Sequence, residues 1–290
     1  MAENVKSLRR RLRSIKNTKK ITRAMEMVSA AKLRRAQEML MAARPYAAKL
    51  QELLGRLAGS GSISHPYFEK RTVARRTLVL VTADRGKAGS FNAQLIKKAE
   101  QILRASDSMD LVCIGKKGYD YFKTRPYPIL FQVSDLGGKL SSERTNEIAD
   151  RLANLFLNGE TDEIQVLYNT FVSMLVFRTT LNKLLPLDPE SMLSSDTPAA
   201  TGMAADYLLE PDPETLLGSL LPRYIKSKIY IVLAETFAAE HSARMVSMSS
   251  ATKNCEELIT SISLTMNQAR QAAITKEILE IVGGAEALKG

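Results

Sequence analysis

Few residues of this chain have the type and spacing that catalysis or metal binding requires. Its two histidines, His65 and His241, lie far apart, and neither belongs to a Cys/His/Asp cluster with metal-ligand spacing. The two cysteines, Cys113 and Cys255, form no Cys-x-x-Cys pair, and each falls in a pattern that predicts a core position. The sequence therefore predicts no catalytic residue, no metal site and no cofactor.

A glycine-bearing loop, 83–90, is the segment whose position would suit a nucleotide. It follows the apolar run 77–82, which predicts a buried strand, and nucleotides bind after the first strand of many α/β sheets. The loop matches neither Gly-x-Gly-x-x-Gly nor Gly-x-x-x-x-Gly-Lys-Ser/Thr, so we interpret Gly86 and Gly89 as turn residues. A nucleotide-binding enzyme stays open as a hypothesis, which tight ATP binding by the chain would favour.

Positive charge is concentrated at the start of the chain. Residues 1–50 contain fourteen Lys and Arg and three Glu, a net charge of +11, whereas the whole chain carries +10. A basic helix of this kind binds nucleic acid, an anionic membrane or an acidic protein, or is simply a solvated face. No aromatic residue precedes Tyr46, so there is no platform on which bases could stack. Charge alone leaves these alternatives open, with a basic coiled-coil nucleic-acid-binding protein among them.

A long helix is expected at the C-terminus. Asp212 and Pro213 form a helix start, Pro222 predicts a kink, and no further glycine or proline occurs before Gly283. A helix over 213–288 would be roughly 110 Å long and needs a long partner. From residue 245 the small or apolar residues recur in alternating steps of three and four, as in a coiled coil. These positions are Met245, Met248, Thr252, Cys255, Ile259, Ile262, Met266, Ala269 and Ala273.

The N-terminus supplies the expected partner helix, which Asn4 would cap. Its apolar seam begins at Leu8, Leu12 and Ile15 and resumes in the same alternating steps from Leu33 to Leu57. Between Val28 and Leu33 the phase of this pattern slips, as at a stutter. The pattern keeps its phase across Pro45, so we expect the helix to continue past this proline.

The middle of the chain alternates predicted strands with predicted helices, which indicates a mainly parallel sheet. The expected strands are 77–82, 110–115, 129–133, 163–171 and 172–184. We therefore predict an α/β fold in which a long antiparallel coiled coil of the two terminal helices carries an inserted Rossmann-like α/β domain. The expected segments are the first helix at 1–58, a linker at 59–75, the α/β domain at 76–185, a loop at 186–211 and the last helix at 212–290.

The chain also lacks the patterns that would place it in or across a membrane. It has no run of about 18 apolar residues and no apolar segment near its charged N-terminus, so we expect neither a membrane span nor a signal peptide. Two isolated cysteines fit a reducing compartment.

Five segments of the chain, 14–32, 82–86, 210–213, 243–252 and 267–282, together match one known family in the family's order. They resemble the γ subunit of F-type ATP synthase, of the bacterial type: 14–32, 243–252 and 267–282 look like its N- and C-terminal signatures, while 82–86 and 210–213 resemble its central and lower parts. Met266-Asn267 and the loop 87–92 depart from the pattern that is frequent in the family. The cysteine-bearing insertion of chloroplast members is absent, so thiol control is not expected.

This resemblance implies a central-stalk rotor that transmits rotation of a membrane c-subunit ring to the catalytic β subunits. It thereby couples proton translocation to ATP synthesis or hydrolysis, without a catalytic site of its own. The implied partners are the α, β and ε subunits and the c ring, not nucleic acid. The implied location is the cytoplasmic face of the bacterial plasma membrane, which the chain reaches only through the complex.

The resemblance also carries residue roles onto matching positions. It implies that the β subunit, through an acidic helix–turn–helix and a loop, contacts Lys20, Arg23, Met25, Arg34, Arg35, Arg270 and Gln271. It implies that coupling at the helix pair involves Arg244, Thr275, Glu277 and Glu280. It implies that the foot on the c ring includes Tyr207 and Glu210.

Overall fold

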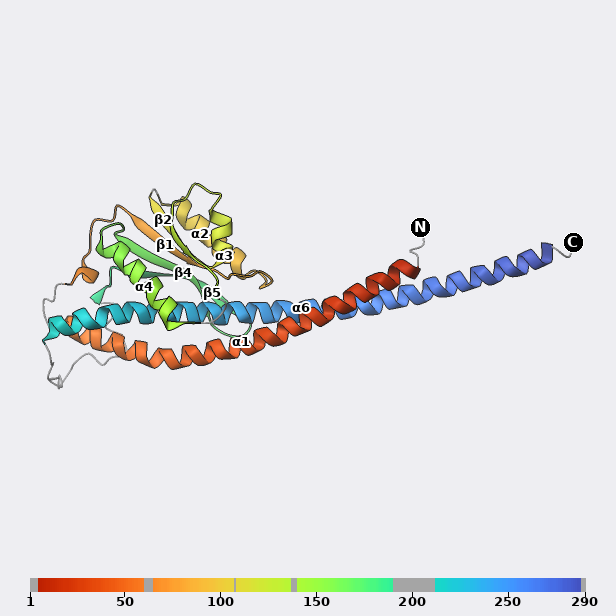
Figure 1. Cartoon of the computed structure of the whole chain (residues 1–290), viewed down its shortest axis with the longest axis horizontal. Helices are drawn as coiled ribbons and strands as arrows, with labels where there is room; N and C mark the ends of the chain where they lie inside the picture. Colours follow the sequence, from red (N-terminus) through yellow and green to blue (C-terminus); the bar gives the residue numbers. More distant parts are fainter. Residues whose placement is uncertain (1–4, 60–64, 107, 137–139, 190–211, 288–290) are drawn as a thin grey trace. The chain divides into compact units, whose positions relative to one another are not determined.

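The computed structural model describes residues 5–59, 65–106, 108–136, 140–189 and 212–287 of the chain. These residues form two compact units. The helix-pair unit comprises the chain up to Ser29 together with everything from Arg244 onward, and the α/β unit comprises Ala30–Ala243. Two helices, α1 (Val5–Gly59) and α6 (Pro213–Ala287), run through both units (Figure 1).

A five-stranded sheet forms the centre of the α/β unit, in the order β3-β2-β1-β4-β5. The first four strands of this order are parallel, and β5 pairs with β4 in the antiparallel direction. This is a Rossmann-type strand order, so the predicted fold class is confirmed. The strands are β1 (Arg76–Val81), β2 (Met109–Ile114), β3 (Ile129–Val133), β4 (Glu163–Phe171) and β5 (Phe177–Leu185).

The fifth strand begins later than the sequence suggested. The backbone N–H of Val176 donates to Ser173 O, and Ser173 N–H donates to Val176 O, so these residues form the turn of a hairpin. Strand β5 therefore begins at Phe177 and not at residue 172.

Helices cover the sheet because alternate strand residues point to opposite faces. Leu78 and Leu80 of β1 are fully buried and join one core cluster with Leu95 of α2 and Phe122 of α3. The neighbouring residue Val79 is also fully buried, as both faces of a parallel sheet require. The sheet helices are α2 (Phe91–Arg104), α3 (Lys116–Phe122) and α4 (Ser142–Leu157), and a short 3₁₀ helix spans Pro66–Phe68.

Helix α6 is part of the core of the α/β unit. All residues of 232–242 are buried, so this stretch has no solvent-exposed face. A helix that is buried on all sides has no narrow apolar stripe, and its polar side chains need internal partners. Glu235, for example, accepts a hydrogen bond at 3.3 Å from Arg44 Nη2 of α1.

The prediction of a stutter in α1 is wrong. Val28 is 56% exposed, while Ser29 is buried and continues the three-four spacing to Leu33 without a slip. The inward positions between Ile15 and Ser29 are Lys19, Thr22 and Glu26. These polar side chains hide the pattern from a search for apolar residues, although the helix keeps one phase throughout.

The helix start at Asp212 is confirmed, because its carboxylate accepts hydrogen bonds from both the N–H and the hydroxyl of Thr215. Helix α6 continues without a break through Pro222, and α1 continues through Pro45. The expected cap Asn4 lies outside the described residues. Among the described helices, none is long and apolar enough to cross a membrane.

Candidate partner-binding surface of the helix pair

In the helix-pair unit, α1 and α6 pack in antiparallel directions. Leu8 and Leu12 near the start of α1 cluster with Ile262, whereas Thr22 further along α1 meets Thr252, which is earlier in α6. Of the predicted α6 seam, Met248, Thr252, Cys255 and Ile262 are buried, in agreement with the spacing. Ala273 is exposed, so the buried part of the seam ends before it.

The outer surface of α1 in this unit is strongly basic. Five cations on it are exposed and have no ion pair or hydrogen bond in the described part of the chain. They are Arg9, Arg10, Arg13, Lys16 and Lys20. Cations that are not neutralised within their own chain favour an anionic partner. The structure therefore presents a basic surface, which we call the α1 basic face, on one long helix.

Three of the predicted β-subunit contacts lie on α1 within this unit. Lys20 belongs to the α1 basic face. Arg23 is exposed and pairs with Glu26 one turn along, at 3.2 Å. Met25 is only partly exposed and lies at the edge of the seam. The structure thus brings these three residues together on one short stretch of helix.

Arg34 and Arg35 lie on the part of α1 that belongs to the α/β unit. Both are exposed, and Arg34 Nε forms an ion pair with Glu38 at 3.3 Å. Exposed pairs of this kind contribute little stability, so their guanidinium groups stay available to a partner.

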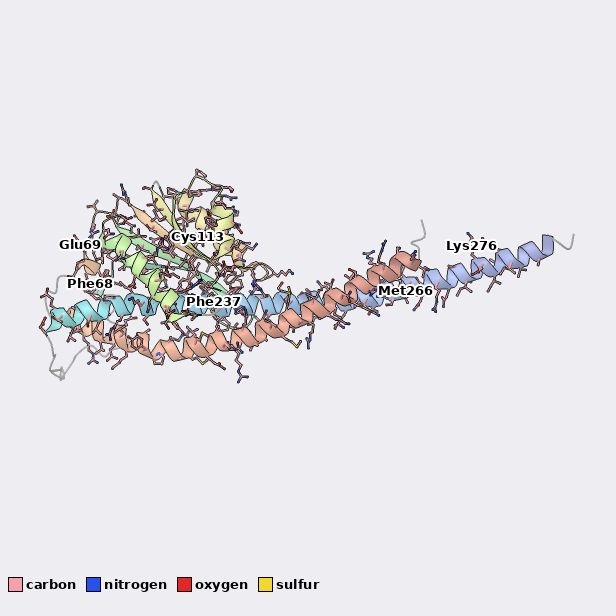
Figure 2. The ribbon with its side chains drawn as sticks, viewed as in Figure 1. Phe68, Glu69, Cys113, Phe237, Met266 and Lys276 are labelled. Atoms are coloured by element: carbon pink, nitrogen blue, oxygen red, sulfur yellow. The ribbon has the colours of Figure 1, made fainter. Side chains whose placement is uncertain are left out.

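The predicted residues near the C-terminus lie on a stretch of α6 without a helical partner in the described chain. Every residue from 270 to 285 is exposed. Figure 2 shows Met266 near the N-terminal start of α1 and Lys276 further along α6, beyond it. This stretch contains Arg270, Gln271, Thr275, Glu277 and Glu280, all outside the seam.

The remaining predicted site residues have different surroundings. Arg244 is 8% exposed, so it is a buried residue of α6 and not part of an open surface. The expected foot residues, Tyr207 and Glu210, lie outside the described residues.

Hydrogen bonds and packing hold the loop after β1 against the start of α2 and against β4. The N–H of Ala83, at the end of β1, donates to Asn92 Oδ1 at 3.0 Å. Phe91 at the start of α2 is fully buried, and the buried Asn169 of β4 donates to its carbonyl at 3.3 Å. Gly115 is needed because a Cβ there would lie 2.0 Å from Thr82 O. Gly89 lies in a turn with φ of 56°, in agreement with our interpretation, whereas Gly86 has neither a turn assignment nor a positive φ.

Both cysteines, Cys113 and Cys255, are buried. Burial raises the pKa of the Cys113 thiol to about 12, so it is not a reactive thiolate. No group of three or more His, Cys, Asp or Glu side chains that could hold a metal ion occurs among the residues that the structure describes.

Sequence reasoning missed two polar contacts between the helices of the pair, one an exposed ion pair and one a buried pair of hydroxyls. Lys19 Nζ forms an ion pair with Glu256 at 2.9 Å, and the hydrogen bond from Lys19 is the main cause that lowers the pKa of Glu256. Beside it, the hydroxyls of Thr22 and Thr252 bond to each other at 2.8 Å. The sequence signal for these contacts was the three-four spacing, which continues without interruption through polar residues. This spacing is recognised only when polar side chains are accepted as seam residues.

Comparison with known proteins agrees with this arrangement along the whole chain. A family model described as ATP synthase matches residues 4–288. The ATP synthase gamma chain of Symbiobacterium thermophilum is 44% identical over 294 residues, which cover 100% of both chains. That of Moorella thermoacetica is 44% identical over 288 residues and 99% of both chains.

Solved structures share the fold at much lower identity. A chain of the Euglena gracilis mitochondrial ATP synthase, in the OSCP/F1/c-ring assembly, has a TM-score of 0.70 at 19% identity, with 98% of this chain and 94% of that chain covered. A chain of the Tetrahymena thermophila mitochondrial ATP synthase central stalk/c-ring has a TM-score of 0.60 at 22% identity, with 80% and 99% covered. The full-length matches to relatives at 44% identity decide the assignment, and this chain belongs to the ATP synthase gamma chain family.

Proposed function

We propose that this chain is the central-stalk rotor subunit of an F1Fo ATP synthase. In this role it has no catalytic site and transmits rotation of a membrane c-subunit ring to the β subunits, which make or hydrolyse ATP. The observation that carries the proposal is the 44% identity to ATP synthase gamma chains over the entire length. The antiparallel helix pair, which provides a long stiff element, supports it.

Rotation changes the β subunits only if the shaft contacts them unequally. A ligand or partner shifts a conformational equilibrium by its differential affinity for the two states, and by nothing more. The helix-pair unit is suited to unequal contact because its α1 basic face carries five unpaired cations on one helix. We infer that this face meets acidic surfaces of the β subunits as the shaft turns.

The proposed contact residues are those that the family resemblance implies. Lys20, Arg23 and Met25 would lie against an acidic element of one β subunit, with Arg34 and Arg35 further along the same helix. Arg270 and Gln271, on the exposed end of α6, would contact a β-subunit loop higher on the shaft. The same end of α6 would place Thr275, Glu277 and Glu280 where coupling is decided, while Arg244 would act from within the pair.

The lower partners and the location complete the proposal. Tyr207 and Glu210 would belong to the foot on the c ring, and an ε subunit would bind the stalk. The chain would then lie at the cytoplasmic face of a bacterial plasma membrane and reach it only through the complex. The bacterial origin of the relatives, including Symbiobacterium thermophilum and Moorella thermoacetica, supports this location. We do not retain nucleic-acid binding, because a β-subunit contact accounts for the basic helix.

Co-expression tests the proposal. The chain is produced with candidate α and β subunits, and the size-exclusion peak is assayed for ATP hydrolysis. We expect the three chains to co-elute with this chain at substoichiometric ratio, and hydrolysis to require it. The chain eluting alone, or with nucleic acid, would contradict the proposal.

A charge-reversal pair sharpens this experiment. Lys16→Glu/Lys20→Glu changes the α1 basic face, whereas Lys97→Glu/Lys98→Glu makes the same change on exposed lysines of α2. We expect the double substitution on the α1 basic face to reduce co-elution with the α and β subunits, most strongly at low salt, where charges are least screened. The double substitution on α2 should leave co-elution unchanged. Equal effects of the two pairs would show that the α1 basic face is not the contact.

A further inference from the structure

The 3₁₀ turn Pro66–Phe68 connects the chain that enters the sheet with the chain that leaves it. It precedes β1, and the carbonyl of Tyr67 accepts a hydrogen bond at 2.8 Å from the N–H of Leu187, just after β5. The Tyr67 side chain is buried, and helix α4 packs against the turn. Figure 2 labels Phe68 and Glu69 at this position. Nothing in the proposed function uses this contact.

The imidazole of His65 caps this turn. The N–H of Tyr67 donates to His65 Nδ1 at 3.2 Å, and the N–H of Phe68 donates to His65 O at 2.9 Å. Pro66 has no N–H, so Tyr67 provides the first donor of the turn. A ring nitrogen accepts a hydrogen bond only while it carries no proton, so this bond requires neutral His65 with its proton on Nε2. The charge state of one side chain therefore decides whether the turn is capped.

The surroundings of His65 oppose its protonation. The residue is partly buried, and the centroid of its ring lies 5.0 Å from that of Tyr67 and 6.4 Å from that of Phe68. Burial lowers the pKa of His65, because the imidazolium loses hydration at this position. The folded protein therefore favours the neutral form that the cap requires.

The charged groups around the turn are engaged with other partners. The titratable groups on the neighbouring segments are Tyr67, Glu69, Lys70, Arg71, Asp150 and Asp188. The carboxylates of Glu69 and Asp188 pair with cations of the segment 70–71, at 2.8 Å and 3.4 Å. Asp150 of α4 pairs with Lys226 at 2.9 Å. In the described part of the chain, no carboxylate forms an ion pair with His65 that would stabilise its imidazolium.

We propose that His65 is a pH-sensitive switch that holds the turn Pro66–Phe68 on Leu187 when it is neutral and releases the turn when it is protonated. Protonation places an N–H on Nδ1 opposite the N–H of Tyr67, so two donors face each other without an acceptor. The turn then loses its cap, and the carbonyl of Tyr67 no longer holds Leu187. The contact is present above the ordinary pKa of histidine, roughly 6.5, and is lost as pH falls through the lower pKa of the folded protein.

Amide hydrogen exchange of the full chain, from about pH 8 to about pH 5, tests this proposal. Protection factors correct for the intrinsic pH dependence of exchange. Those of Tyr67 and Leu187 should fall roughly 2- to 10-fold towards acid pH, which is the factor that one lost hydrogen bond corresponds to. The N–H of Lys117 donates to the carbonyl of Ala83 at 3.1 Å and serves as the internal control, so its protection should not change.

Two substitutions separate the charge of His65 from its role as a cap. Asn Oδ1 and His Nδ1 are both bonded to Cγ, so His65→Asn retains an acceptor that does not titrate in this range. Tyr67 and Leu187 should therefore stay protected in this variant at every pH. His65→Ala removes the acceptor, so both amides should show low protection at every pH. Circular dichroism should show both variants as helical as the unaltered chain.

The nitrogen-15 shifts of the His65 ring provide a test that needs no variant, because they identify which ring nitrogen carries the proton. Three results would overturn the proposal: a proton on Nδ1 of the neutral ring, protection of Tyr67 and Leu187 that stays constant with pH in the unaltered chain, or the same acid loss of protection in His65→Asn. None of these results bears on the co-expression test of the rotor function.

Discussion

Thr252 Oγ1 lies 2.8 Å from Thr22 Oγ1, and this contact joins α6 to α1 in the middle of the helix pair. Both side chains are buried, at 5% and 8% exposure. The single hydroxyl proton of Thr252 has a second acceptor, the carbonyl of Met248 at 2.8 Å, and Thr22 has the carbonyl of Lys19 at 3.0 Å. The two hydroxyls therefore form a small network that extends into both helix backbones.

This network predicts a non-additive pair of substitutions. Thr252→Val removes one hydroxyl and leaves Thr22 without its partner across the pair, so the free energy of unfolding should fall by about 1 kcal/mol. The double variant Thr22→Val/Thr252→Val replaces both by apolar groups of the same shape and should recover most of this loss. Denaturant unfolding of the three variants measures the coupling. Additive losses would show that the hydroxyls do not interact.

The seam predicts different responses from two nearby apolar residues of α6. Ile262 is 7% exposed and packs on Leu8 and Leu12, so Ile262→Ala should lower the free energy of unfolding by about 2–4 kcal/mol. Leu264 is 62% exposed, so Leu264→Ala should change it by less than about 0.5 kcal/mol. Thermal or denaturant unfolding compares the two. A loss at Leu264 as large as that at Ile262 would contradict the seam assignment.

Glu235 predicts a pH dependence of stability. Burial raises the pKa of this carboxyl, against the opposing effects of Arg44 and Tyr168. The folded protein therefore holds the proton more tightly than the unfolded chain, and stability falls as pH rises through the folded pKa. Glu235→Gln should remove this fall, so its stability relative to the unaltered chain should increase from acid to neutral pH.

Arg44→Gln is the complementary variant for that measurement. It removes the cation that lowers the pKa of Glu235, so the fall in stability should become larger and move to higher pH. Unfolding free energies at several pH values follow both variants. A Glu235→Gln difference that stays constant with pH would show that Glu235 keeps the same pKa in the folded and unfolded chain.

Two glycines predict opposite effects of the same substitution. At Gly115 the backbone has φ of 96°, and a Cβ would lie 2.0 Å from Thr82 O, so Gly115→Ala should cost at least about 3 kcal/mol. Gly218 lies inside α6, and a Cβ there meets nothing within 4 Å, so Gly218→Ala should stabilise the protein by about 0.5–1 kcal/mol. Thermal unfolding of both variants gives the sign of each effect.

The proposed rotor function predicts a variant that folds but couples poorly. Met25→Lys adds a cation at a partly exposed position between Arg23 and the seam. The added charge would strengthen the attraction to an acidic β-subunit surface only at those rotation angles of the rotor at which residue 25 faces that surface. We expect unchanged helicity but fewer protons pumped per ATP in vesicles that contain the reassembled complex. Met174→Lys, at a 59% exposed position on the β4–β5 turn, should pump normally. Normal pumping by Met25→Lys would remove this residue from the proposed contact.

The fold was largely predictable because its strands are short apolar runs and its helices have clear starts. The run 77–82 became β1 within one residue, and Asp212 caps α6 as its side chain suggested. The middle of α6 was less readable. Residues 232–242 are buried on all sides, so their sequence shows no apolar stripe with a helical period. A periodic pattern of apolar residues begins only at residue 245, where one face of the helix becomes solvent-exposed.

The candidate site was predictable in its charge but not in its partners. The excess of arginine and lysine on the first helix is a property of composition, and the structure leaves five of these cations unpaired in the described chain. Long-range pairs such as Lys19 with Glu256 and Arg44 with Glu235 depend on how two distant helices align. A single sequence contains no signal that links such residues, so these contacts can be identified only from the three-dimensional structure.

The burial of α6 within the α/β unit has a mechanical consequence. A helix with an exposed face could turn about its own axis by sliding that face through solvent, whereas residues 232–242 have side chains packed in every direction. Any axial turn of this stretch would have to break core contacts around Phe237, and interiors packed at native density yield little to such strain. The sheet and this stretch of α6 must therefore rotate as one rigid body. A torque applied to the α/β unit is transmitted directly to α6.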